Sequence, residues 1–420
     1  MPNFVEDLMH RNTNLQKAHR FRFLRAVFWL GLTAFGGPQM HLPYFKRTLV
    51  DRLGFITHDE LIEINSFCSA LPGPSTTQTI TSIGLKLGGT RLALQALILW
   101  ALPGAFIITA LAVSPKFLGS NELQFMGSAV LGFMAYGTYS MYQWIQPSKL
   151  HYAIFWISGL IGFAIQTPWI YPFSMLVAGF LGAQLGEAPV QPFKAAHVTI
   201  KWRNLAWFVG IFFIVGIAGF VFSKFEKESK WVEPIVLFEN TYRNSSLSLG
   251  GGHVLAAMTV EQYVNHTHRL SMNELNAGIG IVQAIPGPNF NLAAYVNAVS
   301  MKNSGFSTFY QILGALIGLV AVFLPGTLFV FFAFPIWENI KSIDFLQRSL
   351  PALFAVSVGF LLTASLSIGG AVSNQWFLCN PEHKLIHLGV LLFTVLALAS
   401  KKIPSPFIVA AALLVGWVFP

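Results

Sequence analysis

The sequence predicts an all-α polytopic membrane protein built from two homologous halves. Three observations support this fold class. The chain carries few charged residues, it contains many apolar stretches close to the length of a membrane-spanning helix, and a pair of Gly/Pro motifs occurs twice at one spacing.

Composition excludes an ordinary soluble protein. Of 420 residues, 54% are hydrophobic and 10% are charged, whereas soluble proteins carry about 25% charged residues. The net charge of +9 comes from basic residues in short polar segments, and no block of Lys and Arg interleaved with aromatics indicates nucleic-acid binding. Cys68 and Cys379 lie too far apart in the chain to indicate a disulfide framework or a CxxC metal site.

Apolar stretches recur along the chain, each a candidate membrane helix. They cover residues 92–113, 123–144, 152–166, 169–186, 205–222, 306–334, 345–366, 385–400 and 407–419. Four further segments are interrupted by glycine and proline, around residues 36–38, 72–74, 250–252 and 286–288. The polar N-terminal segment 1–20 has no short apolar core before a cleavage site, so we expect a cytoplasmic tail and not a signal peptide.

The interrupted segments form a repeat. A Gly-Gly-Pro motif at residues 36–38 precedes a Pro-Gly-Pro motif at 72–74, and Gly-Gly-Gly at 250–252 precedes Pro-Gly-Pro at 286–288. Both motifs recur at one distance, here called the repeat offset, which also relates Thr57 to Ser271 and Glu60 to Glu274. Pro103-Gly104 matches Pro325-Gly326 after a small insertion. These matches indicate a tandem duplication.

We expect three regions: a first repeat over 1–204, a connecting helix and loop over 205–232, and a second repeat over 233–420. If the first repeat crosses the membrane an even number of times, the unpaired stretch 205–222 makes the second repeat enter from the opposite side. We therefore expect inverted-topology repeats with about 13 membrane segments. If that stretch does not span, the alternative is about 12 segments in parallel repeats. Basic residues before the first apolar run and in 194–203 place both segments in the cytoplasm, with the C-terminus outside.

Each Pro-Gly-Pro motif predicts a broken helix. Proline ends one helix and starts the next well, so a helix should stop near Leu71 and another should begin with Pro74 in its first turn. A new helix presents unpaired amides and the positive end of its dipole, which suits an anion. For one break, a kink that binds nothing is the better interpretation; four matched breaks favour a binding site. The candidate substrate-binding residues are Gly36, Gly37, Pro38, His41, Pro72, Gly73, Pro74, Ser75, Thr76, Thr77, Gln78, Gly250, Gly251, Gly252, His253, Pro286, Gly287, Pro288, Asn289 and Asn291.

Charged residues near the breaks have two interpretations. Glu60 and Glu274 follow Thr57 and Ser271 at the spacing of a capping box, which we favour over proton coupling. Lys86 and Arg91 could attract an anion or extend to the membrane interface. No catalytic, metal-binding or nucleotide-binding motif is found, so we expect no enzyme and no cofactor, and any active transport must draw on ion gradients.

The joint motifs resemble those of a known family. The segments Phe35-Gly36-Gly37-Pro38-Gln39-Met40-His41 and Leu71-Pro72-Gly73-Pro74-Ser75-Thr76-Thr77-Gln78, together with their second copies, resemble the paired signature of the chromate ion transporter family, in its long two-domain form. The second copy departs from the first at Gly252 and Leu292, which suggests unequal contributions from the halves.

The resemblance implies export of chromate across the plasma membrane, driven by the membrane potential or a proton gradient, and hence chromate resistance. Sulfate, with the same charge and shape, is a competing substrate, and sulfate uptake is an alternative function. A membrane receptor or assembly protein without a transported substrate is an alternative of another class. The expected partners are the oxyanion and the lipid bilayer, with a homodimer as a further assembly to test.

Overall fold

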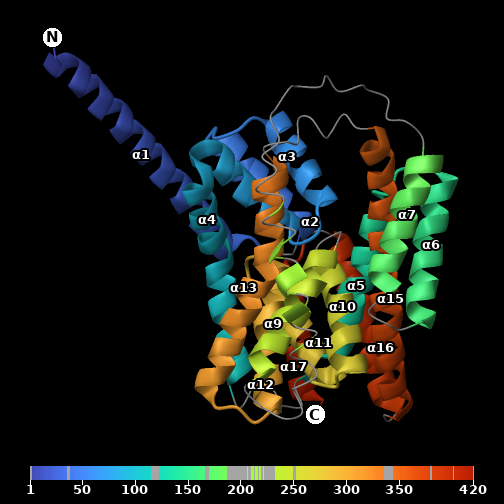
Figure 1. Ribbon diagram of the computed structural model, residues 1–420. Helices are drawn as coiled ribbons and strands as arrows, with labels where there is room; N and C mark the ends of the chain where they lie inside the picture. Colours follow the sequence, from blue (N-terminus) through green and yellow to red (C-terminus); the bar gives the residue numbers. More distant parts are fainter. Residues whose placement is uncertain are drawn as a thin grey trace.

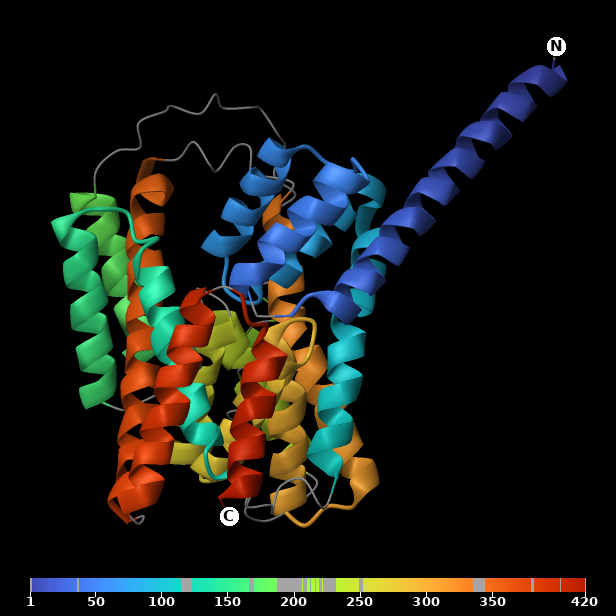
Figure 2. The same ribbon diagram turned by 180° about the vertical axis from the view of Figure 1, so that it is seen from behind.

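The computed structural model describes residues 2–35, 38–114, 123–165, 170–186, 232–248, 252–334, 344–378, 381–400 and 402–419, with isolated positions between 206 and 221. The predicted connecting segment 205–232 and the polar stretch 187–204 therefore lie almost entirely outside the described residues. The described part is a bundle of helices (Figure 1). The two ends of the chain lie at opposite ends of this bundle, as the reverse view also shows (Figure 2).

The first half contains seven α-helices and one π-helical segment among the described residues. These are α1 (Pro2–Thr33), α2 (Pro38–Phe45), η1 (Lys46–Arg52), α3 (His58–Ala70), α4 (Ser75–Val113), α5 (Met126–Tyr142), α6 (Lys149–Ala164) and α7 (Ile170–Leu185). The second half comprises α9 (Glu233–Leu247), α10 (Gly252–Thr259), η4 (Val260–His266), α11 (Met272–Ala284), η5 (Asn289–Asn291), α12 (Leu292–Asn303), α13 (Thr308–Ala333), α15 (Asp344–Leu378), α16 (Pro381–Ser400) and α17 (Ser405–Val418).

The helix bounds follow the repeat offset of the sequence motifs. Three consecutive elements of the first half, α2, η1 and α3, correspond residue for residue to α10, η4 and α11. Even the unusual π-helical segments η1 and η4 occupy matched positions. The two halves thus share a local backbone plan through the region that holds the interrupted segments.

Helix α4 is a hairpin of two arms. Gly88 and Gly89 leave the helical conformation, and Gly89 has a φ of +76°, so the chain reverses between residues 75–87 and 90–113. At Gly84 a Cβ would lie 2.9 Å from the Ala93 Cα, so glycine is needed for the arms to pack this closely. In the second half α12 and α13 form the matching hairpin, and Gly305 between them has a positive φ.

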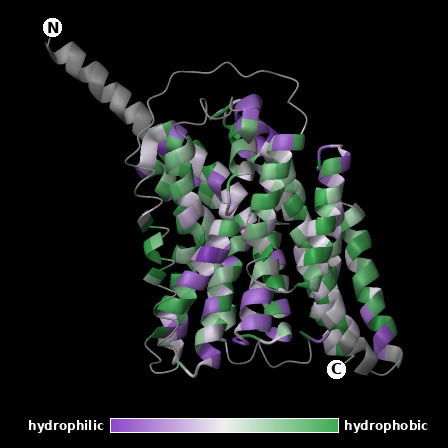
Figure 3. Cartoon of the chain, turned by 45° about the vertical axis from the view of Figure 1, so that its right-hand side comes forward, coloured by the Kyte–Doolittle hydropathy of each residue, from purple (hydrophilic) through white to green (hydrophobic). Residues whose placement is uncertain are grey.

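Apolar helices dominate the outer surface. Four helices, α4, α13, α15 and α16, are long and apolar enough to cross a bilayer, and α6, α7 and α17 are shorter apolar helices. Hydrophobic residues run along the long helices, while hydrophilic residues gather near helix ends and on some inner segments (Figure 3). Exposed side chains such as Phe106, Leu176 and Leu396 are expected where lipid is the solvent.

Small residues bring α15 against helices of the first half. A Cβ at Gly162 of α6 would collide with the Thr363 side chain, and one at Gly159 would lie 2.8 Å from Leu362. The hydroxyl of Thr363 donates a hydrogen bond to the Gly159 carbonyl across this contact. Close backbone approach and interhelical hydrogen bonds are the usual means of joining membrane helices, because lipid provides no hydrophobic driving force.

Candidate functional site

The Pro-Gly-Pro turn of the first half separates two helices. Helix α3 ends at Ala70, Gly73 adopts a φ of +105°, and α4 begins at Ser75. Pro74 occupies the N-cap position, one residue before the predicted first turn. A positive φ is open to glycine without steric cost, so Gly73 lets the chain reverse between the two prolines.

The second Pro-Gly-Pro turn repeats this geometry with one addition. Helix α11 ends at Ala284 and Gly287 has a φ of +96°. Pro288 then caps the short 3-10 segment η5 before α12 begins at Leu292. The sequence places a helix break correctly in both halves, but it does not reveal the 3-10 turn.

Each turn binds the opposite half. The Gly73 N–H donates to the Ser248 carbonyl at 2.7 Å, and the Gly287 N–H donates to the Ala34 carbonyl at 3.1 Å. Ser248 follows α9 and Ala34 follows α1, and these two residues are themselves related by the repeat offset. The contacts are therefore reciprocal, and each turn meets the end of the first helix of the other half.

The contacts that the two Pro-Gly-Pro turns make with the opposite half are here called the junction. The matched pairs Pro103-Gly104 and Pro325-Gly326 complete it. A Cβ at Gly104 would collide with the Pro286 carbonyl oxygen, and a Cβ at Gly326 would lie 3.0 Å from Pro74 Cδ. Each Pro-Gly pair thus packs against the Pro-Gly-Pro turn of the other half. Glycine at these positions allows the backbones to touch, which explains a motif that sequence analysis could match but not interpret.

The junction uses several groups that we expected to be available to an anion. Besides the two glycine amides, the Gln78 side-chain amide donates to the Pro72 carbonyl at 2.7 Å, and that of Asn291 donates to the Ala101 carbonyl at 3.1 Å. These side chains stabilise the turns. The first helical bond of α4 runs from the Gln78 N–H to the Pro74 carbonyl, so the amides of the three residues before Gln78 are the orphan donors of this helix start.

A buried polar cluster adjoins that helix start. His41 Nδ1 lies 3.3 Å from Thr76 Oγ1, and the Trp100 indole N–H donates to Thr77 Oγ1 at 3.2 Å. The His41 and Trp100 rings meet edge to face, 5.0 Å between centroids. All four side chains are buried. His41 also interacts with the backbone of Ala34, which places its ring beside the junction, and its buried Nε2 has no hydrogen-bond partner among the described residues.

The same place in the second half is apolar. The repeat offset relates His41 to Leu255 and Thr76 to Phe290, and Val322 stands three positions before its Pro-Gly pair, as Trp100 does. Leu255, Phe290 and Val322 belong to one hydrophobic cluster. Asn289 and Asn291 are the polar side chains of this turn, and each is buried with an Oδ1 that has no hydrogen-bond partner among the described residues. The first half therefore supplies most of the polar chemistry beside the turns.

Several predicted residues fall outside the described residues. These are Gly36, Gly37, Gly250 and Gly251. For Pro38, Gly252 and His253 the structure describes the backbone alone, which places Pro38 at the start of α2 and Gly252 at the start of α10. Both glycine-rich breaks are thus followed directly by a helix.

Glu60 and Glu274 form capping boxes. The Glu60 carboxylate accepts from the Thr57 N–H at 2.8 Å while the Thr57 hydroxyl accepts from the Glu60 N–H at 3.2 Å, and Glu274 does the same with Ser271. Lys86 lies 2.6 Å from Glu60, so it forms an ion pair at the solvent-facing end of α3. Lys86 and the Thr57 amide lower the pKa of Glu60, which keeps this carboxylate ionised. Arg91 is exposed beyond the α4 turn.

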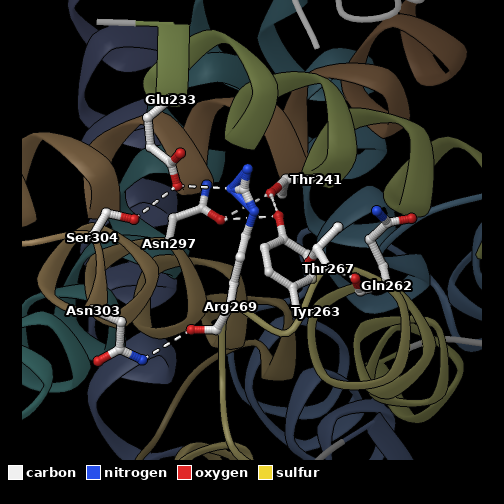
Figure 4. A network of polar contacts seen from close by, with 9 residues as sticks. All are labelled: Glu233, Thr241, Gln262, Tyr263, Thr267, Arg269, Asn297, Asn303 and Ser304. Carbon is white, nitrogen blue, oxygen red and sulfur yellow. Dashed lines mark hydrogen bonds and ion pairs between the residues drawn. The ribbon is translucent and has the colours of Figure 1, made fainter. Parts of the chain in front are cut away.

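Sequence analysis missed a polar network in the second half (Figure 4). Asn297 Oδ1 accepts from Thr241 Oγ1 at 3.1 Å and from the Tyr263 hydroxyl at 3.2 Å, and these two hydroxyls lie 2.9 Å apart. Beside them Arg269 forms a largely buried ion pair with Glu233 at 2.7 Å, and Ser304 donates to the same carboxylate.

The repeat offset could have revealed this network. It relates Thr241, Tyr263 and Asn297 to three apolar residues that pack in one core, namely Val27, Leu49 and Ile83. Three polar replacements at core positions of an otherwise matched copy are a clear signal, because an unpaired buried polar group is costly. Reading the two copies against each other beyond the Gly/Pro motifs would have identified all three residues.

Comparison with known proteins agrees with this architecture. The family model described as chromate transporter matches residues 21–183 and again residues 235–417. The starting positions of these two matches are related by the repeat offset of the Gly/Pro motifs. No solved structure matches the chain.

Three curated relatives align over most of their length. A chromate transport protein of Cupriavidus metallidurans is 24% identical, covering 93% of this chain and 90% of the relative. A probable chromate transport protein of Synechococcus elongatus is 22% identical, covering 93% of each. An uncharacterized transporter of Methanocaldococcus jannaschii is 21% identical, covering 80% of this chain and 81% of the relative. With its family matches in both halves, the chain belongs to the chromate transporter family.

Proposed function

We propose that this protein is a secondary active transporter that exports chromate, or a similar tetrahedral oxyanion, across the cytoplasmic membrane. The observation that carries the proposal is the buried cluster of His41, Thr76, Thr77 and Trp100 beside a broken helix at the junction of the halves. Two of the relatives carry chromate transport in their names, which supports this choice of substrate.

The substrate site is the junction itself. The orphan amides at the start of α4 and the hydroxyls of Thr76 and Thr77 offer donors to an anion. A helix N-terminus stabilises an anion by roughly 0.3–1 kcal/mol, and by up to about 2 kcal/mol when partly buried. Several such donors together replace much of the hydration of a dianion. The predicted set of glycines and prolines at the four breaks shapes the backbone around it, and His253 and Asn289 complete the side of the second half.

The two halves adopt inverted topology, with boundaries at 1–204, 205–232 and 233–420 and about 13 membrane segments. The reciprocal bonds from Gly73 and Gly287 support a two-fold relation between the halves, which inverted and parallel repeats share. In Figure 1, α2 and α3 lie toward the upper end of the bundle and α11 and α12 toward the lower end. Reporter fusions after Lys201 and after Lys230 test it. Reporters on the same side of the membrane would refute inversion and favour parallel repeats.

Export is the simpler direction for a dianion. With the cell interior negative, each charge is worth about 2.3 kcal/mol per 100 mV, so a departing dianion gains about 4.6 kcal/mol per 100 mV, over a thousandfold in concentration ratio. Uptake of the dianion would have to overcome the same electrical free energy and would need several coupled cations. Glu60, whose pKa is lowered by its ion pair, is poorly suited to carry a proton at neutral pH.

Sulfate uptake is the alternative within the same class, because sulfate presents the same tetrahedral dianion to the same donors. Flux of labelled chromate and labelled sulfate into liposomes that contain this protein alone tests the proposal. We expect saturable chromate flux that unlabelled sulfate inhibits. If liposomes with correctly folded protein take up neither ion faster than empty liposomes, the transporter proposal fails and the receptor or assembly class replaces it.

A further inference from the structure

A basic pocket lies between α1 and η1, beside the junction of the halves but lined by other residues. Its volume is about 570 Å³, and three arginines line it, Arg22, Arg25 and Arg52. Thr33, Thr48 and Trp29 add two hydroxyls and an indole ring. No carboxylate belongs to the described lining residues. The pocket is large enough for a charged head group, and each of its polar lining residues can donate a hydrogen bond.

The arginines of this pocket have no acidic partner in the part of the chain that the structure describes. Among the described residues, none of Arg22, Arg25 and Arg52 forms an ion pair. The neighbouring carboxylate on η1, Asp51, already pairs with Lys46 at 3.1 Å. Three like charges around one cavity repel one another, and an anion in the pocket would relieve that repulsion.

The corresponding position in the second half carries an ion pair that the first half lacks. At the repeat offset Arg25 becomes Glu239, Trp29 becomes Arg243 and Thr48 becomes Gln262. There Arg243 pairs with Glu239 at 2.7 Å and donates to Gln262 at 3.2 Å. The second half thus neutralises this position with its own side chains. In the first half the position is an open cavity with an unneutralised charge.

The exposed aromatic residues beside the pocket indicate that the anion belongs to a lipid head group. Trp29 is 54% exposed and Phe21 is 67% exposed on the same helix, next to the arginines. Exposed aromatic rings beside arginines are typical of the interface between lipid tails and head groups. Arginine guanidinium groups bind phosphate in a bidentate manner, and basic pockets between membrane helices bind anionic lipid head groups.

We propose that the pocket between α1 and η1 binds the phosphate of an anionic phospholipid, with Arg22, Arg25 and Arg52 as its ligands. The acyl chains then lie along the exposed aromatic residues of α1. The pocket adjoins the end of α1, where the Ala34 carbonyl accepts the Gly287 amide, so a bound lipid holds the helix that contacts the turn of the second half. A free phosphate or sulfate ion offers the same head-group chemistry without the chains.

The test is a titration of the full-length protein, in a neutral detergent, with short-chain phosphatidylglycerol, short-chain phosphatidylcholine, inorganic phosphate and sulfate. The readout is the lipid concentration that gives half of the maximal rise in melting temperature. The pocket variant replaces all three arginines by glutamine. A second variant, Arg25→Glu, copies the charge found in the second half and allows an internal ion pair. The matched control is Arg47→Gln with Lys402→Gln, two exposed cations outside the pocket.

We expect saturable stabilisation by phosphatidylglycerol, little by phosphatidylcholine, and an affinity about a hundredfold weaker in the triple variant, at roughly a few-fold per arginine. Arg25→Glu should fold and lose the lipid affinity, while the control should keep it. Equal binding of phosphatidylglycerol by the wild-type protein and by Arg25→Glu would overturn the proposal. Binding of free phosphate or sulfate as tightly as phosphatidylglycerol, and lost in the triple variant, would overturn the lipid as the source.

Discussion

The two halves share a backbone plan but place their buried polar side chains at different points of it. Beside the Pro-Gly-Pro turn the first half is polar, with His41, Thr76 and Trp100, where the second half packs apolar side chains. At the positions of the Thr241, Tyr263 and Asn297 network, the second half is polar and the first half is apolar. There the second half joins Thr241 and Tyr263 to a shared amide oxygen, and the first half packs an apolar core.

The buried polar groups of the two halves suit two different roles, substrate binding in the first half and structural support in the second. In the cluster of the first half, His41 Nε2 is a buried polar atom without a hydrogen-bond partner among the described residues, which suits a group that a substrate completes. In the network of the second half, the hydroxyls and the Asn297 oxygen bond to one another, while Asn297 Nδ2 has no partner among the described residues. The three hydrogen-bonded oxygens suit a structural support. We therefore expect changes in the first cluster to alter transport and changes in the second network to alter stability.

The largest effect should follow replacement of the turn glycines. Gly73→Leu forces a side chain into a φ of +105°, with its Cβ 3.3 Å from Gly326 Cα, and Gly287→Leu forces one into a φ of +96°. A non-glycine residue in such a conformation costs about 1–3 kcal/mol, and at the junction it also separates the halves. We expect both variants to insert and to lose transport, as measured by anion flux in vesicles.

Gly54→Leu is the matched control, because Gly54 also has a positive φ but no atom lies within 4 Å of an added Cβ. It should carry the backbone strain and retain transport. Full transport in correctly inserted forms of both turn variants would remove the junction as the substrate site.

The next effect should come from making the first half resemble the second at the cluster. His41→Leu copies Leu255, and Thr76→Val removes one hydroxyl with little change of volume. Both side chains are buried, and the second half shows that this backbone accepts an apolar cluster. We expect a tenfold or greater loss of initial transport rate, about 1.4 kcal/mol or more, with near-normal melting temperature. Wild-type rates in both variants would contradict a substrate role for this cluster.

Making the second half resemble the first at the polar network should lower the stability of the protein. Asn297→Ile copies Ile83 and leaves the Thr241 and Tyr263 hydroxyls without their acceptor, at a cost of about 1–3 kcal/mol. The triple variant Thr241→Val, Tyr263→Leu, Asn297→Ile removes all three polar groups, as the first half does at these positions. We expect the triple variant to lose less stability than the sum of its single changes, measured by thermal unfolding in detergent. Additive losses would mean that the three side chains do not act as one network.

The smallest effect should come from Glu60→Gln and Glu274→Gln. Glutamine preserves a capping box, so these changes remove the charge and keep the helix start. The pKa of Glu60 is lowered in the folded protein, so its charge contributes stability above the unfolded pKa and loses it as pH falls through the folded pKa. Because Glu60 is partly exposed, Glu60→Gln should cost at most about 1 kcal/mol and leave transport intact.

Loss of transport in a folded Glu60→Gln or Glu274→Gln variant would instead identify a carboxylate that couples proton movement. The measurement is the initial flux rate at neutral pH beside the melting temperature of the same sample. A rate that falls without a fall in melting temperature separates coupling from capping.

Much of the fold could be predicted because the repeat is marked by glycine and proline. Their conformational limits show where helices stop, and the repeat offset then relates α2, η1 and α3 to α10, η4 and α11. Capping boxes at Thr57 and Ser271 were equally predictable, since they depend on residues three positions apart.

The contacts between the halves could not be predicted. Nothing local to Gly73 indicates that its amide meets Ser248, or that Gln78 and Asn291 use their side-chain amides on backbone carbonyls. Trp100 was also missed, because an aromatic residue in an apolar stretch is usually a lipid-facing or core residue. Its indole N–H finds a partner in Thr77 only after α4 folds back at Gly88 and Gly89.

In the proposed mechanism the junction carries a dianion outward under the membrane potential. The most direct measurement follows labelled chromate and labelled sulfate separately in inside-out vesicles held at a defined potential. With the lumen positive, we predict chromate accumulation that rises with the potential, that requires the protein, and that His41→Leu reduces. If chromate accumulates no faster than in vesicles that lack the protein, or accumulates equally at zero potential, chromate export by this mechanism is wrong.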